Sequence, residues 1–296
     1  MQILCYDIGG TDIKYGVVED GEIIYKSSMK TSPELGRASL EERLIQVALE
    51  IVSKYDIKAV GVSSSGSIDC KTGKVLIPGD KIKIMKDMDF SKLFRDSVGL
   101  EVAADNDVNC FGEAESKTGA GIKYDNFLMM TIGTGIGGAI IYEDKVMHGL
   151  NYNAGEFGRM LLGDTKFEDL ASTSALIKNA KDAGLKVDNG LDLYKLYDAN
   201  DPVARKVVGE FYHYLAIGIA NLVYIFNPEA IMIGGGISNR ETLTDEIKVE
   251  LKKILQPEFF NTITIENSIH KNEGGLLGAY FNAVNKLRLI ENGGNL

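Results

Sequence analysis

The sequence predicts an α/β protein made of two similar lobes, and three observations lead to this prediction. Three short apolar runs within residues 2–25 are separated by a Gly-Gly turn and an Asp-Gly turn, which is typical of an antiparallel three-stranded meander. Residues 127–147 repeat the same order of strand, glycine turn, strand, acidic turn and strand. Each of these regions is followed by a helical pattern and a buried strand pattern. We therefore expect an internal duplication of one α/β lobe.

Length and composition limit the class of protein. The chain has 296 residues, enough for two domains, and its 45% hydrophobic and 25% charged content is that of an ordinary globular protein. The formal charge of −10 argues against a nucleic acid or an anionic membrane as a partner. No segment contains the roughly 18 apolar residues that a membrane span requires, and the first residues lack the features of a signal peptide. We expect a cytoplasmic protein.

A helix and two strands are expected after the first meander. Ser39, with Glu42 three residues later, has the pattern of a capping box, so the helix is expected to begin there. Apolar runs at residues 59–62 and 101–104 predict buried strands. The second of these strands leads into the polar run Asp105-Asn106-Asp107.

The second half of the chain predicts a long helix, a glycine-ended strand and a final helix. Residues 203–226 have helical periodicity, and Asn227-Pro228 ends that pattern. Residues 230–236 predict a buried strand that leads into three consecutive glycines. A last helix is expected from residue 274 to about residue 288.

The cysteines and histidines are scattered and form no metal-binding spacing. We expect small buried side chains at all three cysteines, Cys5, Cys70 and Cys110. We expect surface or packing roles, rather than metal ligation, at His148, His213 and His270.

Three strands end in glycine turns that suit the binding of phosphate. Glycine lets backbone N–H groups approach a phosphate closely and tolerates positive φ. None of the three fits the P-loop or the Rossmann pattern, and each one alone is weak evidence. The turns are Gly9-Gly10-Thr11, Gly133-Thr134-Gly135 and Gly234-Gly235-Gly236.

Taken in order, these residues resemble the ROK family of sugar kinases and sugar-responsive repressors, within the wider hexokinase–actin superfamily. Asp7 to Thr11, with Lys14, is similar to the first phosphate motif, residues 131–138 to the second, and residues 227–236 to the adenosine motif. Asn106-Asp107 matches the catalytic stretch, and Gly155-Glu156 matches the sugar-binding signature. The resemblance runs from residue 2 to residue 279.

The resemblance implies a two-lobed actin-like ATPase (ribonuclease H-like) fold with an interlobe cleft. It implies a small lobe of residues 1–106, joined by the last helix at about 276–288, and a large lobe of residues 107–275. It further implies a homodimer that uses ATP and Mg²⁺.

The resemblance also implies roles for individual residues in an ATP-dependent sugar kinase. Asp107 would be the general base for the sugar hydroxyl, and Asp7 would lie near Mg²⁺ through water. Sugar contacts are implied for Asn106, Glu156, Glu168, Ser65 and Gly66. Nucleotide contacts are implied for Asp7, Gly9, Gly10, Thr11, Lys14, Gly133, Thr134, Gly135, Gly234, Gly235 and Gly236.

The chain departs from the family pattern after Gly155-Glu156. Most members have a histidine where this chain has Arg159, followed by a cysteine-rich zinc segment, whereas residues 160–168 here contain no cysteine. Structural zinc needs about four nitrogen or sulfur ligands, so we expect no zinc. This branch most resembles the bacterial β-glucoside kinases, while N-acylmannosamine kinases and glucokinases stay open.

Two other classes of function are less consistent with the motifs. A non-catalytic sugar-sensing protein would lack a phosphate or base motif, and an actin-like ATPase without sugar specificity would lack Asn106-Asp107 together with Gly155-Glu156. The family's repressors carry a winged-helix domain before the first phosphate motif, and here that motif begins at Asp7. We therefore expect a kinase rather than a repressor.

Overall fold

The computed structural model describes residues 1–293, which group by their contacts into two compact units. Of the described residues, the first unit contains 1–122, 145–154 and 272–293, and the second contains 123–144 and 155–271. The first unit thus runs past residue 106, where the sequence analysis placed the lobe boundary. It does so because helix α3 (Asp107–Thr118) packs against the last helix, α10 (Gly274–Glu291).

The first unit contains a five-stranded mixed sheet with the strand order β3-β2-β1-β4-β7. The predicted meander forms its antiparallel half, and two strands add in parallel to β1 and then to β4. The strands are β1 (Gln2–Ile8), β2 (Asp12–Glu19), β3 (Glu22–Lys30), β4 (Ile57–Ser64) and β7 (Glu101–Asn106).

The second sheet repeats this topology with the order β10-β9-β8-β13-β14, in which β9, β8, β13 and β14 belong to the second unit. Its meander is again followed by two parallel strands. The order and directions of pairing of β9, β8, β13 and β14 match those of β2, β1, β4 and β7, so the predicted duplication is confirmed. The strands are β8 (Phe127–Ile132), β9 (Ile136–Tyr142), β10 (Lys145–Val146), β13 (Ala230–Gly234) and β14 (Thr264–Asn267).

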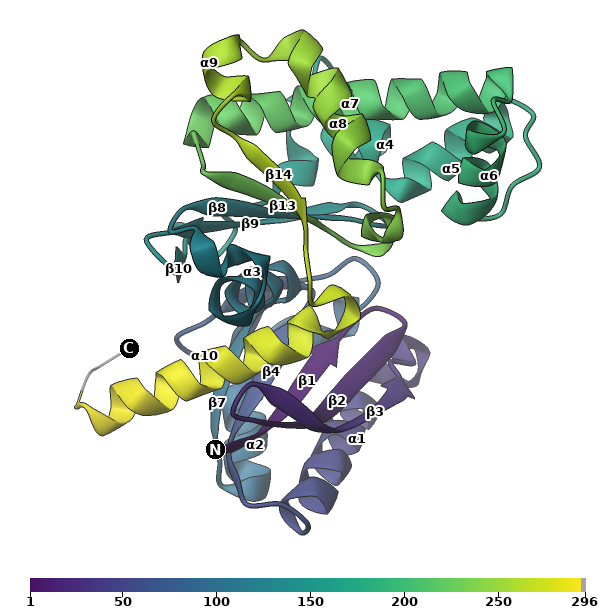
Figure 1. Ribbon diagram of the computed structural model, residues 1–296. Helices are drawn as coiled ribbons and strands as arrows, with labels where there is room; N and C mark the ends of the chain where they lie inside the picture. The colour runs from purple at the N-terminus through teal and green to yellow at the C-terminus, as the bar shows by residue number, and fades with distance from the viewer. Residues whose placement is uncertain (294–296) are drawn as a thin grey trace. The chain divides into compact units, whose positions relative to one another are not determined.

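Helices cover both faces of the first sheet (Figure 1). Helices α1 (Gly36–Val52) and α2 (Phe90–Val98) cover one face, and α3 and α10 cover the other. Alternation along β1 divides its side chains between two cores: Leu4 and Tyr6 pack with α1 and α2, whereas Ile3 and Cys5 pack with α10. A strand that is buried on both sides explains the nearly continuous apolar run in the sequence.

The predicted capping box of α1 is wrong. The helix begins at Gly36, its N-cap is Leu35, and no side chain caps it. A 3-10 turn at Pro33–Leu35 leads directly into the helix, and Pro33 provides a fixed φ suited to a helical start. Ser39 therefore lies inside the helix rather than at its N-cap.

Helix α7 (Pro202–Phe226) is the long helix predicted in the second unit. The Asp201 carboxylate accepts hydrogen bonds from its first turn, and Asn227 ends it with φ of 43°. Helix α4 (Phe167–Ala171) packs on it through Phe167, whose ring lies against Gly218. Within residues 1–293, no helix combines the length and the apolar content needed to span a bilayer.

The remaining elements are short. The first unit also has the hairpin β5 (Gly66–Asp69) and β6 (Lys74–Pro78). The second has β11 (Leu161–Leu162), β12 (Thr165–Lys166), α5 (Thr173–Asp182), α6 (Gly190–Asp198), α8 (Leu243–Ile254) and α9 (Pro257–Phe260).

Candidate active site

The junction of β7 and α3, residues 105–109, holds the central candidate residues of the first unit. Asn106 is the N-cap of α3: its Oδ1 accepts hydrogen bonds from the N–H groups of Val108 at 2.8 Å and Asn109 at 3.2 Å. Its Nδ2 donates to the carbonyl oxygen of Gly66 at 2.9 Å. Asp107 is the first residue of the helix and is half-buried. The structure thus brings together Asn106, Asp107 and Gly66, which the sequence analysis had assigned to one sugar site.

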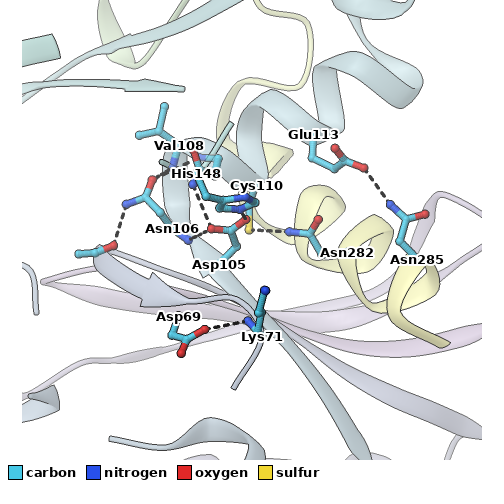
Figure 2. A network of polar contacts seen from close by, with 12 residues as sticks. Asp69, Lys71, Asp105, Asn106, Val108, Cys110, Glu113, His148, Asn282 and Asn285 are labelled. Atoms are coloured by element: carbon cyan, nitrogen blue, oxygen red, sulfur yellow. Dashed lines mark hydrogen bonds and ion pairs between the residues drawn. The ribbon is translucent and has the colours of Figure 1, made fainter. Parts of the chain in front are cut away.

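Asp105 is buried beside this junction, and both of its carboxylate oxygens are bonded (Figure 2). Its Oδ1 accepts from the Asn106 N–H at 2.7 Å and from Asn109 Nδ2 at 3.0 Å. Its Oδ2 lies 2.7 Å from Nε2 of His148. His148 therefore packs in the fold, and it also pairs with a buried carboxylate, which its place in the sequence did not indicate. No local signal could have revealed the pair, because 43 positions separate its members in the sequence.

The environment of His148 favours its protonated form. Burial alone would lower the pKa of His148, but hydrogen bonds with Asp105 and with Cys70 outweigh this effect and raise it to about 10. Cys5 and Cys110 are buried as predicted. Cys70 is only half-buried, which contradicts its predicted role as a small buried side chain, because it lies after β5 beside the imidazole.

The first glycine turn joins β1 to β2 with Asp7 and Lys14 at its base. The Gly9 N–H donates to the Asp12 carbonyl oxygen at 3.1 Å and closes the turn. Asp7 Oδ1 accepts from the Ser63 hydroxyl at 2.8 Å, and its Oδ2 lies 3.1 Å from Lys14 Nζ. Asp7 and Lys14 face each other because they are register partners in the antiparallel pair.

Ser65 and Gly66 lie at the end of β4, in the strand next to β1. The Ser65 N–H donates to the Ile8 carbonyl oxygen at 3.4 Å. Gly66 has φ of +104°, a conformation that favours glycine. The parallel pairing of β4 with β1 therefore carries these two residues to the same end of the sheet as the first glycine turn.

The second and third glycine turns lie together in the second unit. A Cβ at Gly235 would lie 2.4 Å from the Ile132 carbonyl oxygen, so only glycine lets β13 approach β8 this closely. Gly133, Thr134 and Gly236 line one cavity of about 670 Å³, and Gly236 also lines a second of about 750 Å³. The residues predicted for phosphate and adenosine thus share one region of this unit.

Arg240 lies on the wall of the larger cavity and was not found by sequence reasoning. Its guanidinium is held by Asp198 at 2.8 Å and by Glu246 at 2.6 Å, and it lies over the Tyr194 ring with its Cζ 4.3 Å from the ring centroid. These partners come from two helices, with Tyr194 and Asp198 on α6 and Glu246 on α8, so no sequence motif indicates the cluster.

Two predicted sugar ligands, Glu156 and Glu168, lie in the second unit. Glu156 is exposed, and its Oε2 accepts from Arg159 Nε at 2.9 Å. Glu168 lies near the start of α4. A Cβ added at Gly135 would lie 2.6 Å from its Oε2, and a Cβ added at Gly158 would lie 3.0 Å from it. The structure therefore brings Glu168 next to the second glycine turn and pairs Glu156 with the arginine that replaces the usual histidine.

Comparison with known proteins identifies the family. The chain matches the ROK family over residues 3–285. It is 35% identical over 293 residues to the β-glucoside kinase of Listeria innocua serovar 6a, covering 95% of this chain and 97% of that protein. It is 31% identical over 294 residues to the β-glucoside kinase of Klebsiella pneumoniae, covering 95% of each chain.

Solved structures of similar proteins agree with this assignment. The ROK family glucokinase from Streptomyces griseus, in complex with glucose and AMPPNP, superposes with a TM-score of 0.81 at 27% identity, covering 96% of this chain and 100% of that one. The Lmo2764 protein from Listeria monocytogenes gives 0.87 at 32% identity, covering 97% of this chain and 100% of that one. The motifs and the duplicated topology of this chain, together with these matches, show that the chain belongs to the ROK family.

Proposed function

We propose that the protein is an ATP-dependent sugar kinase that phosphorylates the 6-hydroxyl group of a β-glucoside. The main support is the β7–α3 junction, where Asp107 begins a helix whose N-cap, Asn106, is anchored to the carbonyl oxygen of Gly66. Relatives named β-glucoside kinase, at 31–35% identity over most of the chain, support both the reaction and the substrate class. Arg159 supports the substrate class further. Most of the family has a histidine at this position, near the anomeric end of the sugar, and its replacement should relax recognition at that end, where a β-glucoside carries its substituent.

Asp107 acts as the general base. As the 6-hydroxyl oxygen attacks the γ-phosphorus of ATP, the carboxylate accepts the hydroxyl proton and the bond from the γ-phosphorus to the bridging oxygen of ADP breaks. The products are the 6-phosphorylated sugar and ADP. The position of Asp107 in the first turn of α3 suits this role, because a helix N-terminus favours a negative charge.

Sugar hydroxyl groups need acceptors in fixed positions. Asn106, Ser65 and Gly66 provide polar groups in the first unit, and their hydrogen bonds to neighbouring backbone hold them in place. Glu156 and Glu168 provide carboxylates in the second unit, where Arg159 holds Glu156. Carboxylates and amides can each accept hydrogen bonds from the hydroxyls of a polyol.

The nucleotide is bound by the glycine turns. The N–H groups of Gly10 and Thr11, with Lys14, and those of Thr134 and Gly135 bind phosphates, and Gly234, Gly235 and Gly236 make room for the adenosine. Gly9 and Gly133 close the two turns through their own N–H groups and let the backbone approach the phosphates. Asp7 is a suitable partner for Mg²⁺ or its water ligands, because its carboxylate lies at the base of the first turn. Mg²⁺, when bound, neutralises charge on the phosphates. We also expect a homodimer.

A sugar panel tests this proposal. With ATP and Mg²⁺, we expect cellobiose and aryl β-glucosides to give sugar-dependent ADP with a kcat/KM at least as high as that of free glucose. A methyl 6-deoxy-β-glucoside is the matched control and should release none, because it lacks the acceptor hydroxyl. A tenfold advantage for glucose or N-acetylmannosamine would overturn the β-glucoside assignment and leave the kinase. No sugar-dependent ADP with any sugar would overturn the kinase in favour of a sugar-sensing protein.

A further inference from the structure

Asp105 is a buried carboxylate that the proposed reaction does not use. Its side chain is only 5% exposed, and a buried carboxylate without partners is strongly destabilising. Its two oxygens have separate partners (Figure 2). Oδ1 binds the β7–α3 junction through the Asn106 N–H and the Asn109 side chain, and Oδ2 binds His148. One carboxylate therefore connects the residues around Asp107 to His148.

His148 belongs to a segment, residues 145–154, that packs with the first unit although the chain on both sides of it belongs to the second. Asn153 pairs with Ser67 of β5, and the Ala154 N–H donates to the His148 carbonyl oxygen at 3.1 Å. The next two residues in the chain are Gly155 and Glu156. The His148–Asp105 contact thus holds residues 145–154 on the β7–α3 junction. These residues directly precede the proposed sugar ligand Glu156, and the junction carries the proposed base, Asp107.

We propose that Asp105 and His148 form a positioning pair for phosphoryl transfer, which holds Asn106 and Asp107 in the geometry that the reaction needs. The inference rests on the proposed kinase function, because it assigns the pair a task only in that reaction. Neither residue touches the reacting atoms in this scheme. They act through the backbone and side-chain bonds of the junction.

The charges around His148 agree with an ion pair. Asp105 lies on β7, Cys70 lies after β5, and the Tyr152 ring packs at a centroid distance of 6.0 Å within the same segment. Glu113 on α3 has a weaker electrostatic interaction with the imidazole; burial and Asp105 raise its pKa, while Lys117, Asn285 and His148 oppose that effect. Asp105 is thus the carboxylate in contact with His148, and its charge favours the imidazolium.

A suppression experiment tests the pair. His148→Ala leaves the buried Asp105 carboxylate without its cation, so the junction should shift. Because a displacement of about 1 Å can cost on the order of 10²-fold in rate, we expect kcat to fall about 10- to 100-fold, with the KM for ATP changed less than about twofold. Asp105→Asn keeps an oxygen for Asn106 and Asn109 but removes the negative charge. The double variant His148→Ala/Asp105→Asn should therefore be several-fold more active than His148→Ala alone.

The matched control is His213→Ala, a histidine that is exposed on α7 and should leave kcat unchanged. If His148→Ala keeps more than half of the wild-type kcat, or if the two substitutions act independently in the double variant, the positioning pair is overturned. Should His148→Ala fail to fold, His148→Gln keeps an N–H donor and should give a kcat below wild type, and an unchanged kcat would overturn the proposal. A wild-type protein that phosphorylates no sugar would instead overturn the proposed function, which is measured first.

Discussion

At the first turn of α3, the Asp107 carboxylate accepts a hydrogen bond from the N–H of Val108 at 2.9 Å and remains half-buried. Asp105, two positions earlier, is almost fully buried and bonded on both oxygens. The two carboxylates therefore have different environments despite their proximity in the sequence. Of the two, Asp107 has the exposure that a group in contact with substrate needs.

Replacement of Asp107 by asparagine tests its role as the base. The substitution is nearly isosteric and removes only the proton acceptor, and general-base catalysis contributes roughly 10²- to 10⁴-fold. We expect kcat to fall by that factor, or about 3–5 kcal/mol of barrier, with the KM values for sugar and ATP changed much less. Steady-state kinetics with saturating sugar and ATP measure both quantities.

The control for this prediction cannot be Asp105, because the loss of its charge would disturb the junction. Asp245→Asn is suitable, since Asp245 is likewise an aspartate in the first turn of a helix, α8, but is exposed, and it should leave kcat unchanged. An Asp107→Asn protein that retains more than about a tenth of the wild-type kcat would show that another group accepts the proton.

His148 should make the free energy of unfolding depend on pH. Its pKa is raised to about 10 from an ordinary value of 6.5, so the stabilisation is complete below pH 6.5 and is lost as the pH rises through about 10. His148→Gln cannot titrate. The difference in unfolding free energy between wild type and this variant should therefore shrink between pH 6 and pH 10 in urea titrations. A difference that stays constant or grows with pH would contradict the ion pair.

At the scale of the elements, the contact of α4 with α7 depends on one glycine. A Cβ on Gly218 would lie 2.2–2.7 Å from three atoms of the Phe167 ring, which is fully buried. Gly209, in the same helix, has no atom within 4 Å of such a Cβ and is exposed. Alanine substitutions at these two glycines therefore distinguish the effect of helix propensity on stability from the effect of packing.

Alanine at these two positions should change stability in opposite directions. Gly209→Ala should stabilise the protein by up to about 1 kcal/mol, because alanine is the better helix former. Gly218→Ala should destabilise it, since overpacking of a core typically costs about 1–3 kcal/mol. Midpoints of urea unfolding followed by circular dichroism measure both effects. A Gly218→Ala protein as stable as Gly209→Ala would show that the Phe167 ring moves aside at little cost.

At the scale of the whole molecule, we expect the metal requirement to distinguish this chain from relatives with a zinc segment. Arg159 replaces the histidine, and residues 160–168 provide no cysteine or histidine, whereas structural zinc needs about four such ligands. We expect dialysed protein to contain far less than one zinc per chain by elemental analysis. A chelator should abolish kinase activity, and Mg²⁺ alone should restore it. About one tightly held zinc per chain would contradict this prediction.

The α/β class, the duplicated order of strands and the positions of the glycine turns could be predicted from the amino-acid sequence. These features are local: strand and helix periodicity extend over a few residues, and turns need particular residues at particular places. For this reason the two ends of α7 and the start of α10 agree with the predictions to within about two residues. Even so, local pattern failed at α1, where Ser39 resembles a cap but a preceding 3-10 turn starts the helix.

Which polar side chains meet could not be predicted from the sequence and follows from the packing of the elements. The contact of Asp105 with His148, the contact of Cys70 with His148, and the packing of Glu168 beside Gly135 each join residues from separate elements. A single histidine or carboxylate in a loop has no periodicity that could reveal its partner. Its environment depends on how strands pair and on where a segment such as residues 145–154 packs. Those arrangements are set by burial of apolar surface across the whole unit, and no short stretch of sequence contains that information.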